Sequence, residues 1–579
     1  MSLFDSASLV VTPNGVKAGK LYSIKPTDGS GDLSVTRATS ATRVDANGLI
    51  EIPRTNLTQR SEDFDNGYWV KTNSDITSNT AIAPDGNLTA DTFSDRVLLT
   101  NQTYPIARNQ SYTSGTAYTS SFFAKNLDRR YVYMRFVSAV FGTNKYVFFD
   151  LQLGTIISVS SGVTAEIIDY GNGWYRCIAT STASVTTSTV NGVFIGLSDN
   201  GVNVAYTNPS VKSIYLWGAQ LEVGNSATEY IPTTSSSIRT KFAGITQDGA
   251  SASNIPRLDY TNGSCPSILV EPQRTNLVLR SEEFDNIIWS LGLSATISAN
   301  TTISPDGTQN ADTLTLINAA TSRIQQTISA TSSTYTVSIY AKSSVSKKFR
   351  FRIITSGTSQ ISNDFTTSNI WQRYSFTFTS DILRIEIINE SLAVAGSLDI
   401  WGAQLEAGAN ATSYIPTTSA TVTRNADVIS KTGISDLIGQ TEGTVLCDIN
   451  LTKLSESKAL FVIDNGTTNE YINLIRVSTN IFRLSIKKTG TSAVNIINSA
   501  VINDSRCRIA IAYKNGDYAM YVNGVQKGTS TNSTNYPTTA LTQFVLSNAS
   551  YGYLNDSFNA SAIWKTRLTN AELETLTTI

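Results

Sequence analysis

The sequence contains no histidine among its 579 residues. Histidine serves as the base in Ser-His-Asp and Cys-His nucleophile systems and is a common zinc ligand, so these catalytic sites and every His-containing metal site are excluded. Cysteine is scarce, and Cys177, Cys265, Cys447 and Cys507 form no CxxC pair. We therefore predict neither a metal knuckle nor a disulfide-rich scaffold, and we expect no cofactor.

Charged residues are also few, at 15% of the chain, against ~25% in an average soluble protein. The net charge is -1, so there is no general attraction to phosphate backbones or anionic membranes. No run of 18 apolar residues occurs, and the opening MSLFDSASLVVTP lacks a basic stretch followed by an apolar core. These absences predict no nucleic-acid partner, no membrane insertion and no signal peptide, in a chain made in the cytoplasm.

A long internal duplication organises most of the chain. RTNLTQRSEDFDNGYW (54–69) recurs as RTNLVLRSEEFDNIIW (274–289) with 11 of 16 positions identical. WGAQLEVGNSATEYIPTTS (217–235) recurs as WGAQLEAGANATSYIPTTS (401–419) with 15 of 19 identical. The two copies therefore mark both ends of a module that occurs twice, and the first copy is 36 residues longer between these anchors.

Inside the modules, apolar and polar residues alternate, as in YTVSIYAK (335–342) and KKFRFRII (347–354). This is the period of a strand with one buried face, and polar turn residues separate such runs about every ten positions. We predict an all-β fold in which each module is an antiparallel β-sandwich of the jelly-roll type. Lead-in hairpins, with Asn47-Gly48 and Asn262-Gly263 at their turns, precede the two modules and act as spacers or inter-subunit contacts.

The pattern changes near residue 420, where neither anchor recurs. CRIAIAYK (507–514), Asn515-Gly516, DYAMYV (517–522) and Asn523-Gly524 predict strand, turn, strand and turn. Thr569 and Glu572 form a capping box that predicts one short C-terminal helix. The predicted domains are an attachment segment with lead-in hairpin (1–50), jelly rolls at 51–235 and 273–419, a linker hairpin (236–272) and a terminal domain (420–579).

The stretches IAYKNGDYAMYVNGVQKG and SFNASAIWKTRLTNAELETL resemble the laminin-G or concanavalin-like sandwich that ends many bacteriophage tail proteins. The RTNL to YIPTTS repeats resemble carbohydrate-binding jelly rolls of phage fibre and spike proteins. The resemblance implies a virion adhesin, a tail fibre or receptor-binding protein that binds host surface polysaccharide multivalently. It also implies virion partner proteins, a homo-oligomer, most simply a trimer, and a place on the particle exterior after assembly in the host cytoplasm.

Matched residues of the two copies are interpreted as structural. Large aromatics retained in both copies indicate packing rather than sugar platforms. Arg54 and Arg274, with Glu222 and Glu406, are interpreted as ion pairs or turn clamps, while Asn56 and Asn276 satisfy backbone groups. The tryptophan pairs are Trp69 and Trp289, Trp174 and Trp371, and Trp217 and Trp401.

Unmatched aromatic residues are the better ligand candidates, because sugar rings stack on exposed side-chain rings. Tyr551 and Tyr553 lie in the predicted loop SNASYGYLND of the terminal domain, and Tyr68 is replaced by Ile288 in the second copy. These three tyrosines are the predicted ligand-binding residues, with receptor specificity assigned to the terminal domain.

Two other functions, calcium binding and glycan hydrolysis, have weaker support in the sequence. The acidic cluster of Glu62, Asp63 and Asp65 carries calcium-type ligands but lacks the alternating spacing of a dedicated loop, so a solvated turn is favoured. A glycan-degrading tailspike needs two carboxylates across the sugar, and Glu283-Phe284-Asp285 begins such a pattern without completing it. We predict binding rather than catalysis, with a capsid-decorating fibre or spike as the structural alternative.

Overall fold

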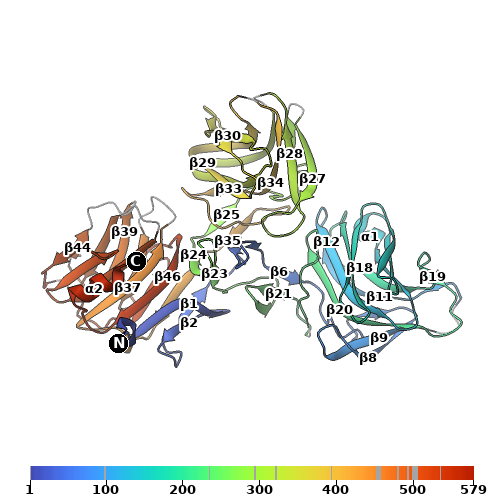
Figure 1. Cartoon of the computed structure of the whole chain (residues 1–579), viewed down its shortest axis with the longest axis horizontal. Helices are drawn as coiled ribbons and strands as arrows, with labels where there is room; N and C mark the ends of the chain where they lie inside the picture. Colours follow the sequence, from blue (N-terminus) through green and yellow to red (C-terminus); the bar gives the residue numbers. More distant parts are fainter. Residues whose placement is uncertain are drawn as a thin grey trace. The chain divides into compact units, whose positions relative to one another are not determined.

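The computed structural model describes residues 2–579 except 97–99, 234, 293–294, 320–321, 393, 452–457, 479–480, 492–493, 498–505 and 535. Antiparallel strands dominate it (Figure 1), and the predicted all-β class of sandwich-type folds is confirmed. The chain divides into two compact units, residues 53–252 and residues 1–52 with 253–579, which are described in turn.

Residues 53–252 hold the first module, in which two six-stranded antiparallel sheets enclose one core. The sheet orders are β15-β14-β13-β18-β11-β7 and β16-β17-β12-β20-β9-β8. Phe122 of β12 meets Phe149 of β14 edge-on across the core, with ring centroids 6.4 Å apart. The strands of the two sheets are β7 (Val70–Lys71), β8 (Ser74–Ile82), β9 (Leu88–Asp95), β11 (Pro105–Tyr112), β12 (Ala117–Asn126), β13 (Tyr131–Phe136), β14 (Lys145–Asp150), β15 (Thr155–Val159), β16 (Thr164–Asp169), β17 (Trp174–Thr182), β18 (Thr187–Ser198) and β20 (Ser213–Val223).

Smaller elements complete this unit. The pair β10 (Gln102–Thr103) and β19 (Ala205–Tyr206) lies outside the two main sheets, and helix α1 (Ser138–Phe141) follows β13. A three-stranded sheet joins β6 (Arg54–Asn56), β21 (Arg239–Phe242) and β22 (Ile245–Asp248). Because β6 precedes the sandwich and β21 follows it, the pairing of these two strands brings the two ends of the first module together.

The second module is built from a nine-stranded sheet around its own core. Its β29 runs unbroken through positions that form β11, a turn and β12 in the first module, and register shifts after Thr327 and Ala330 let the β29–β33 ladder bend. Only β31 and β32 lie between β30 and β33, where the first module has β14, β15 and β16, which accounts for much of its shorter length. The strands are β26 (Ser290–Gly292), β27 (Thr296–Thr302), β28 (Ala311–Leu316), β29 (Arg323–Lys342), β30 (Lys348–Ile354), β31 (Gln360–Ile361), β32 (Phe365–Thr366), β33 (Gln372–Asn389) and β34 (Gly396–Ala407), and the pair β25 (Arg274–Asn276) and β35 (Val422–Arg424) closes the module.

The terminal sandwich draws strands from two distant parts of the sequence, in the path β41-β40-β39-β38-β45-β36-β3-β2-β1-β46-β37-β42-β43-β44, and a third part adds a pair of strands beside β46. Its first strands are β1 (Leu9–Lys17), β2 (Lys20–Lys25) and β3 (Leu33–Thr36), which follow the short 3-10 helix η1 (Leu3–Ser6). The others are β36 (Val428–Thr432), β37 (Glu442–Asn450), β38 (Lys458–Asp464), β39 (Tyr471–Ser478), β40 (Ile481–Lys487), β41 (Val494–Ile497), β42 (Arg506–Lys514), β43 (Tyr518–Val522), β44 (Val525–Ser530), β45 (Gln543–Ser547) and β46 (Asp556–Trp564), with the 3-10 helix η2 (Ser435–Leu437) and helix α2 (Asn570–Thr577).

The first 36 residues therefore contribute strands to the terminal sandwich, and their predicted role in attachment stays a prediction. Strand β1 pairs with β46 and β3 pairs with β36, so the blue and red strands lie side by side in Figure 1. Leu9, Leu21 and Leu33 are buried in the same core as the last strands. The sequence misses this relation because alternation reveals a strand but not its distant partner.

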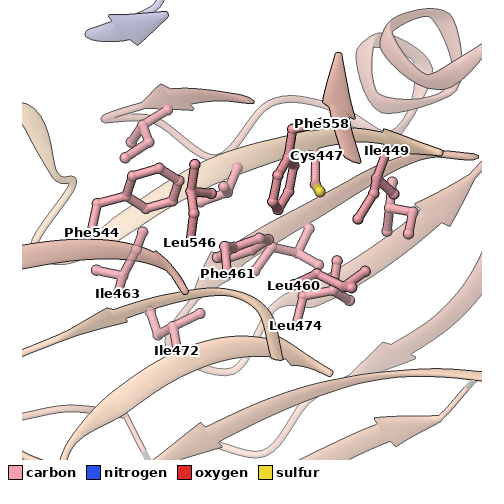
Figure 2. Packing of buried hydrophobic residues seen from close by; sticks show 14 of the residues in the cluster. Cys447, Ile449, Leu460, Phe461, Ile463, Ile472, Leu474, Phe544, Leu546 and Phe558 are labelled. Atoms are coloured by element: carbon pink, nitrogen blue, oxygen red, sulfur yellow. The ribbon is translucent and has the colours of Figure 1, made fainter. Parts of the chain in front are cut away.

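The core of the terminal sandwich lies between layers of strands. Figure 2 shows Phe461, Ile463 and Phe544, from β38 and β45, beside Cys447 and Phe558 from β37 and β46. All five side chains are buried. The strand, turn, strand and turn predicted over 507–524 are confirmed as β42, β43 and the start of β44. The C-terminal helix is confirmed too, since Thr569 and Glu572 exchange the hydrogen bonds of a capping box.

The two lead-in hairpins both belong to the larger unit. The hairpin β4 (Arg43–Val44) and β5 (Ile50–Glu51) precedes the first module in sequence, but Ile50 packs with Trp401 and Tyr414 of the second module. The pair β23 (Arg257–Asp259) and β24 (Ser267–Val270) extends the terminal sandwich, because β24 pairs with β46. The interpretation of these hairpins as spacers is thus corrected, since both are packed parts of folded bodies. None of the helices described is long and apolar enough to cross a membrane.

Candidate ligand-binding cavity

The matched asparagines Asn56 and Asn276 have the same structural role in the two modules. Asn56 Nδ2 donates to Ala219 O and Ile231 O, and its Oδ1 accepts from Thr58 N and Leu221 N. Asn276 makes the corresponding four bonds in the second module. Both side chains are fully buried, so the prediction that they satisfy backbone groups is confirmed.

The matched tryptophans also behave as packing residues. Five of the six are buried, and Trp371 is half-buried against the cluster that holds Ile50 and Trp401. Trp174 Nε1 and Trp371 Nε1 donate to the equivalent carbonyls of Ile82 and Ile303. This equivalence confirms that the retained aromatics serve the fold.

The matched glutamates are likewise structural. Glu406 is fully buried, accepts hydrogen bonds from Thr412 and Gln404, and lies 3.8 Å from Arg274 Nε. Glu222 receives the same bonds from Thr228 and Gln220. These glutamates clamp the turn that follows the last strand of each module, as predicted.

The three predicted ligand tyrosines are all half-buried rather than exposed platforms. Tyr551 packs edge-on against Tyr471, its hydroxyl donates to Thr467 O at 3.1 Å, and burial raises the pKa of its phenol. Tyr68 packs edge-on against Trp69, and its hydroxyl accepts from Gln59 N. Tyr68 belongs to the unit of residues 53–252, whereas Tyr551 and Tyr553 belong to the other unit.

The acidic cluster of the first module lines a polar hollow of about 280 Å³. Glu62, Asp63 and Asp65 share it with Asp91, which accepts from Phe64 N and Asn79 N. Burial raises the pKa of Asp91 to about 6. Within the described ranges, no three acidic or cysteine side chains come close enough to hold a metal ion.

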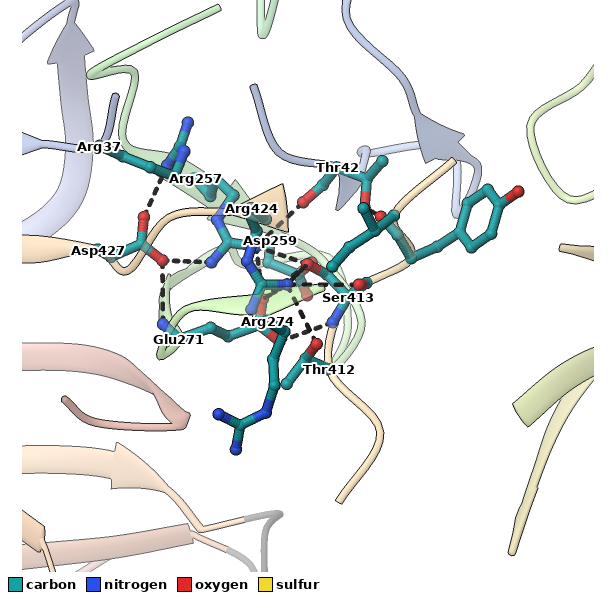
Figure 3. A network of polar contacts seen from close by, with 12 residues as sticks. Arg37, Thr42, Arg257, Asp259, Glu271, Arg274, Thr412, Ser413, Arg424 and Asp427 are labelled. Atoms are coloured by element: carbon teal, nitrogen blue, oxygen red, sulfur yellow. Dashed lines mark hydrogen bonds and ion pairs between the residues drawn. The ribbon is translucent and has the colours of Figure 1, made fainter. Parts of the chain in front are cut away.

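A buried network of charges lies where the lead-in strands meet the terminal sandwich (Figure 3). Asp427 accepts from Arg37 at 2.6 Å and also from Arg257. Glu271 accepts from Arg257 at 2.7 Å and forms an ion pair with Arg424, whose Nη1 lies 2.9 Å from its Oε2. All five side chains are essentially inaccessible to solvent. Burial opposes ionisation of Glu271, but Arg424 and Arg257 hold its pKa well below the usual range.

Beside this network is a cavity of about 290 Å³. The hairpin β4–β5 and the pair β23–β24 form part of its wall, Tyr340 and Tyr414 of the second module form another part, and the residues that begin β46 complete it. Thr261 and Asn262 at its rim are exposed, so the cavity opens to solvent. Its size lies at the lower end of small-molecule sites, ~300–1,000 Å³, and suits a ligand of one or two rings.

Asn555 is the most informative residue of this cavity. Its side chain is only 3% exposed, yet neither Oδ1 nor Nδ2 has a hydrogen-bond partner. A buried polar group without a partner costs ~1–3 kcal/mol, and native proteins rarely retain one without a reason. The amide is thus a buried donor and acceptor at the cavity wall, with no protein group bonded to either atom.

Three charged groups act on the phenol of Tyr340 from the same wall. Burial first, and then the nearby Asp259 and Glu271, raise the pKa of Tyr340, whereas Arg373 lowers it. Arg373 lies over the Tyr340 ring at 5.3 Å, and Asp259 accepts from Val44 N and Thr261 N. The cavity thus combines an aromatic wall with a carboxylate, a guanidinium and an unpartnered amide.

Sequence reasoning missed this site. Tyr340 and Tyr414 lie in segments singled out as strand and anchor, but Asn555 lies in the same stretch as Tyr551 and Tyr553 with nothing to distinguish it. A buried unpartnered amide is recognisable only from its surroundings. The nearest signal of this site in the sequence was the loop SNASYGYLND, whose penultimate residue, Asn555, lines the cavity.

No protein-family model matches the sequence, and no curated protein matches it. Several solved structures are similar to part of the chain. The CBM40 module of the Ruminococcus gnavus IT-sialidase, solved with α2,3-sialyllactose, is 17% identical with a TM-score of 0.22 over 24% of this chain and 84% of that one. Domain 4 of the arabinanase AbnA from Geobacillus stearothermophilus, solved with arabinotriose, is 16% identical with a TM-score of 0.23 over 29% and 82%. The NanB sialidase from Streptococcus pneumoniae is 16% identical with a TM-score of 0.23 over 26% of each chain.

Proposed function

We propose that the chain is a glycan-binding protein and that the cavity beside Asn555 is a sugar site. The carrying observation is the buried Asn555 amide, whose donor and acceptor are both unpartnered. A sugar hydroxyl donates and accepts, so neighbouring hydroxyls on one ring satisfy both atoms of a single amide. The Asp259 carboxylate has remaining lone pairs for a further hydroxyl, and Tyr340 and Tyr414 supply apolar surface for the ring.

The arrangement favours binding over hydrolysis. A glycosidase needs one carboxyl that stays protonated as an acid and a second carboxylate across the bond. In the cavity, Glu271 is held ionised by Arg257 and Arg424, and Asp556 is within 3.3 Å of Arg476. A carboxylate held by arginines is a poor general acid, which leaves Asp259 as the one carboxyl of the lining without an arginine partner among the described residues. Because a glycosidase needs two carboxyl groups, the wall favours recognition of an intact glycan.

The likeness of the two modules and the terminal sandwich to phage fibre modules supports a virion adhesin that assembles as a trimer. A single small site binds weakly, and several sites tethered on one particle act at high effective concentration. Light scattering of the purified chain at micromolar concentration tests the oligomer, and a stable monomer contradicts it. A cryo-EM map of the particle tests the location.

The sugar site is tested with Asn555→Leu, which replaces the amide by an apolar side chain of similar size. Saturation-transfer NMR of the full chain with a panel of methyl glycosides is expected to show binding that the variant loses at least tenfold. Removing an unpartnered buried amide should raise the melting temperature at the same time, so lost binding cannot be ascribed to unfolding. Asn469→Ala, at an exposed position, serves as the control and should bind as the unmodified chain does. Unchanged binding by Asn555→Leu contradicts the site.

A further inference from the structure

We propose that the cavity beside Asn555 selects uncharged sugars over acidic ones. This inference rests on the proposed sugar site and adds the class of ligand. It follows from an account of every charged side chain that lines the cavity. These side chains are Arg43, Asp259, Glu271, Arg373 and Asp556.

Three of the five are neutralised by partners of opposite charge. Arg43 pairs with Glu51 at 2.7 Å, Glu271 pairs with Arg257 and Arg424, and Asp556 pairs with Arg476. An ion pair already formed within the protein gives little net attraction to a charged ligand. Arg373 and Asp259 are therefore the two charged lining residues that have no ion-pair partner among the described residues.

The guanidinium of Arg373 is hydrogen-bonded within the second module. Its Nη1 donates to Thr412 O, its Nη2 donates to Ser338 Oγ at 2.9 Å, and its face covers Tyr340. Arg176 has the same arrangement in the first module, donating to Ser121 Oγ at 3.0 Å and lying over Phe123 at 5.3 Å. Both terminal nitrogens of Arg373 therefore have a protein partner, and its Nε, which has none, is closed to solvent, so a two-pronged grip on a ligand carboxylate would require the side chain to move.

Asp259 has the opposite character. Each of its oxygens accepts one backbone amide, from Val44 at 2.9 Å and from Thr261 at 3.0 Å, and no cation of the described residues forms an ion pair with it. An ionised carboxylate only accepts, so it binds hydroxyl donors and repels the carboxylate of a uronic or sialic acid. With the neutral Asn555 amide as the other polar anchor, the wall favours a ligand that carries hydroxyls and no charge.

The experiment uses matched pairs of methyl glycosides that differ only at C6: glucoside and glucuronide, galactoside and galacturonide, mannoside and mannuronide. Binding to the full chain is measured by saturation-transfer NMR at pH 7. For the pair that binds, the neutral member should bind at least tenfold more tightly than the acidic one. Asp259→Asn should reduce this ratio several-fold, and Asp436→Asn, at an exposed position outside the cavity, should leave it unchanged.

The outcomes separate the two proposals. Equal or tighter binding of the acidic member, abolished by Asn555→Leu, overturns the selectivity and leaves the sugar site standing. A preference for the neutral member that persists unchanged in Asp259→Asn overturns the role given to this carboxylate. Binding of no glycoside overturns the sugar site, and the selectivity falls with it.

Discussion

Leu9 lies directly opposite Ile563, so a residue near the start of the chain and one near its end share a strand pairing. Both side chains are fully buried in the terminal sandwich. The body that carries the last strands is therefore also the body that carries the first. The N-terminal strands and the terminal sandwich form one folded unit instead of two opposite ends of a fibre.

Deletion of residues 2–36 should unfold the terminal sandwich. The deletion removes β1, β2 and β3, so the last part of β46 (561–563) and the strand β36 each lose the partner on one side, while β24 still pairs with the start of β46. Each lost large apolar side chain, such as Leu9, Leu21 or Leu33, takes away ~1.5–3 kcal/mol of burial. Hydrogen exchange should show lost protection in β37 and β46 while β12 and β20 of the first module stay protected. Native protection of β46 in the deletion variant would show that these strands are dispensable.

Glu271→Gln should destabilise the larger unit by ~3–5 kcal/mol, because it leaves Arg257 and Arg424 without a full counter-charge in a site closed to solvent. Urea unfolding followed by tryptophan fluorescence measures the change. The control is Glu442→Gln, whose partner Lys514 is 56% exposed and whose loss should cost at most ~1 kcal/mol. Equal effects of the two variants would contradict a structural role for the network.

The folded state should gain stability from Asp312 as the pH falls. Burial raises the pKa of Asp312 to about 6, so the folded state takes up this proton at a higher pH than the unfolded chain, whose carboxyl has its ordinary value near 3.8. The contribution is unfavourable above pH 6 and is relieved between about pH 6 and pH 4. Asp312→Asn cannot take up the proton. The stability of the unmodified chain relative to this variant should therefore rise from pH 7 to pH 4.5.

Thermal unfolding at several pH values measures this difference. Asp91, whose pKa burial also raises to about 6, gives an independent repeat in the first module through Asp91→Asn. A difference in stability that stays constant between pH 7 and pH 4.5 for both variants would argue against proton uptake by these carboxyls.

Tyr551→Ala should lower the melting temperature. Its ring packs against Tyr471 and its hydroxyl bonds to Thr467 O, so truncation removes buried surface and one hydrogen bond, together ~2–4 kcal/mol. This differs from the behaviour of an exposed stacking platform, whose loss would leave stability unchanged. Tyr551→Phe is the matched control and should retain most of the stability. An unshifted melting temperature for Tyr551→Ala would contradict this prediction and support the interpretation of Tyr551 as an exposed stacking platform.

The duplication, the all-β class and the roles of Asn56 and Asn276 could be predicted because they depend on local patterns repeated in the sequence. The pairing of Val10 with Ala562 could not, since period-two alternation marks the buried face of a strand without identifying its neighbour. Ile50 shows the same limit, because its hairpin precedes one module and packs on the other. The role of Asn555 depends on the absence of hydrogen-bond partners, which is a property of the folded surroundings.

The pairing of the first strand with the last also sets an order of events during translation. At ~5–20 residues per second, roughly half a minute to two minutes separate the synthesis of β1 from that of β46. Both jelly-roll modules are synthesised in this interval, during which the edge of β1 that later pairs with β46 has no partner. A ribosome that stops before residue 556 releases a chain with this apolar edge uncovered, a surface that pairs readily with other strands. Strand β46 thus acts as a check on synthesis, because only a chain translated through this strand can cover the β1 edge.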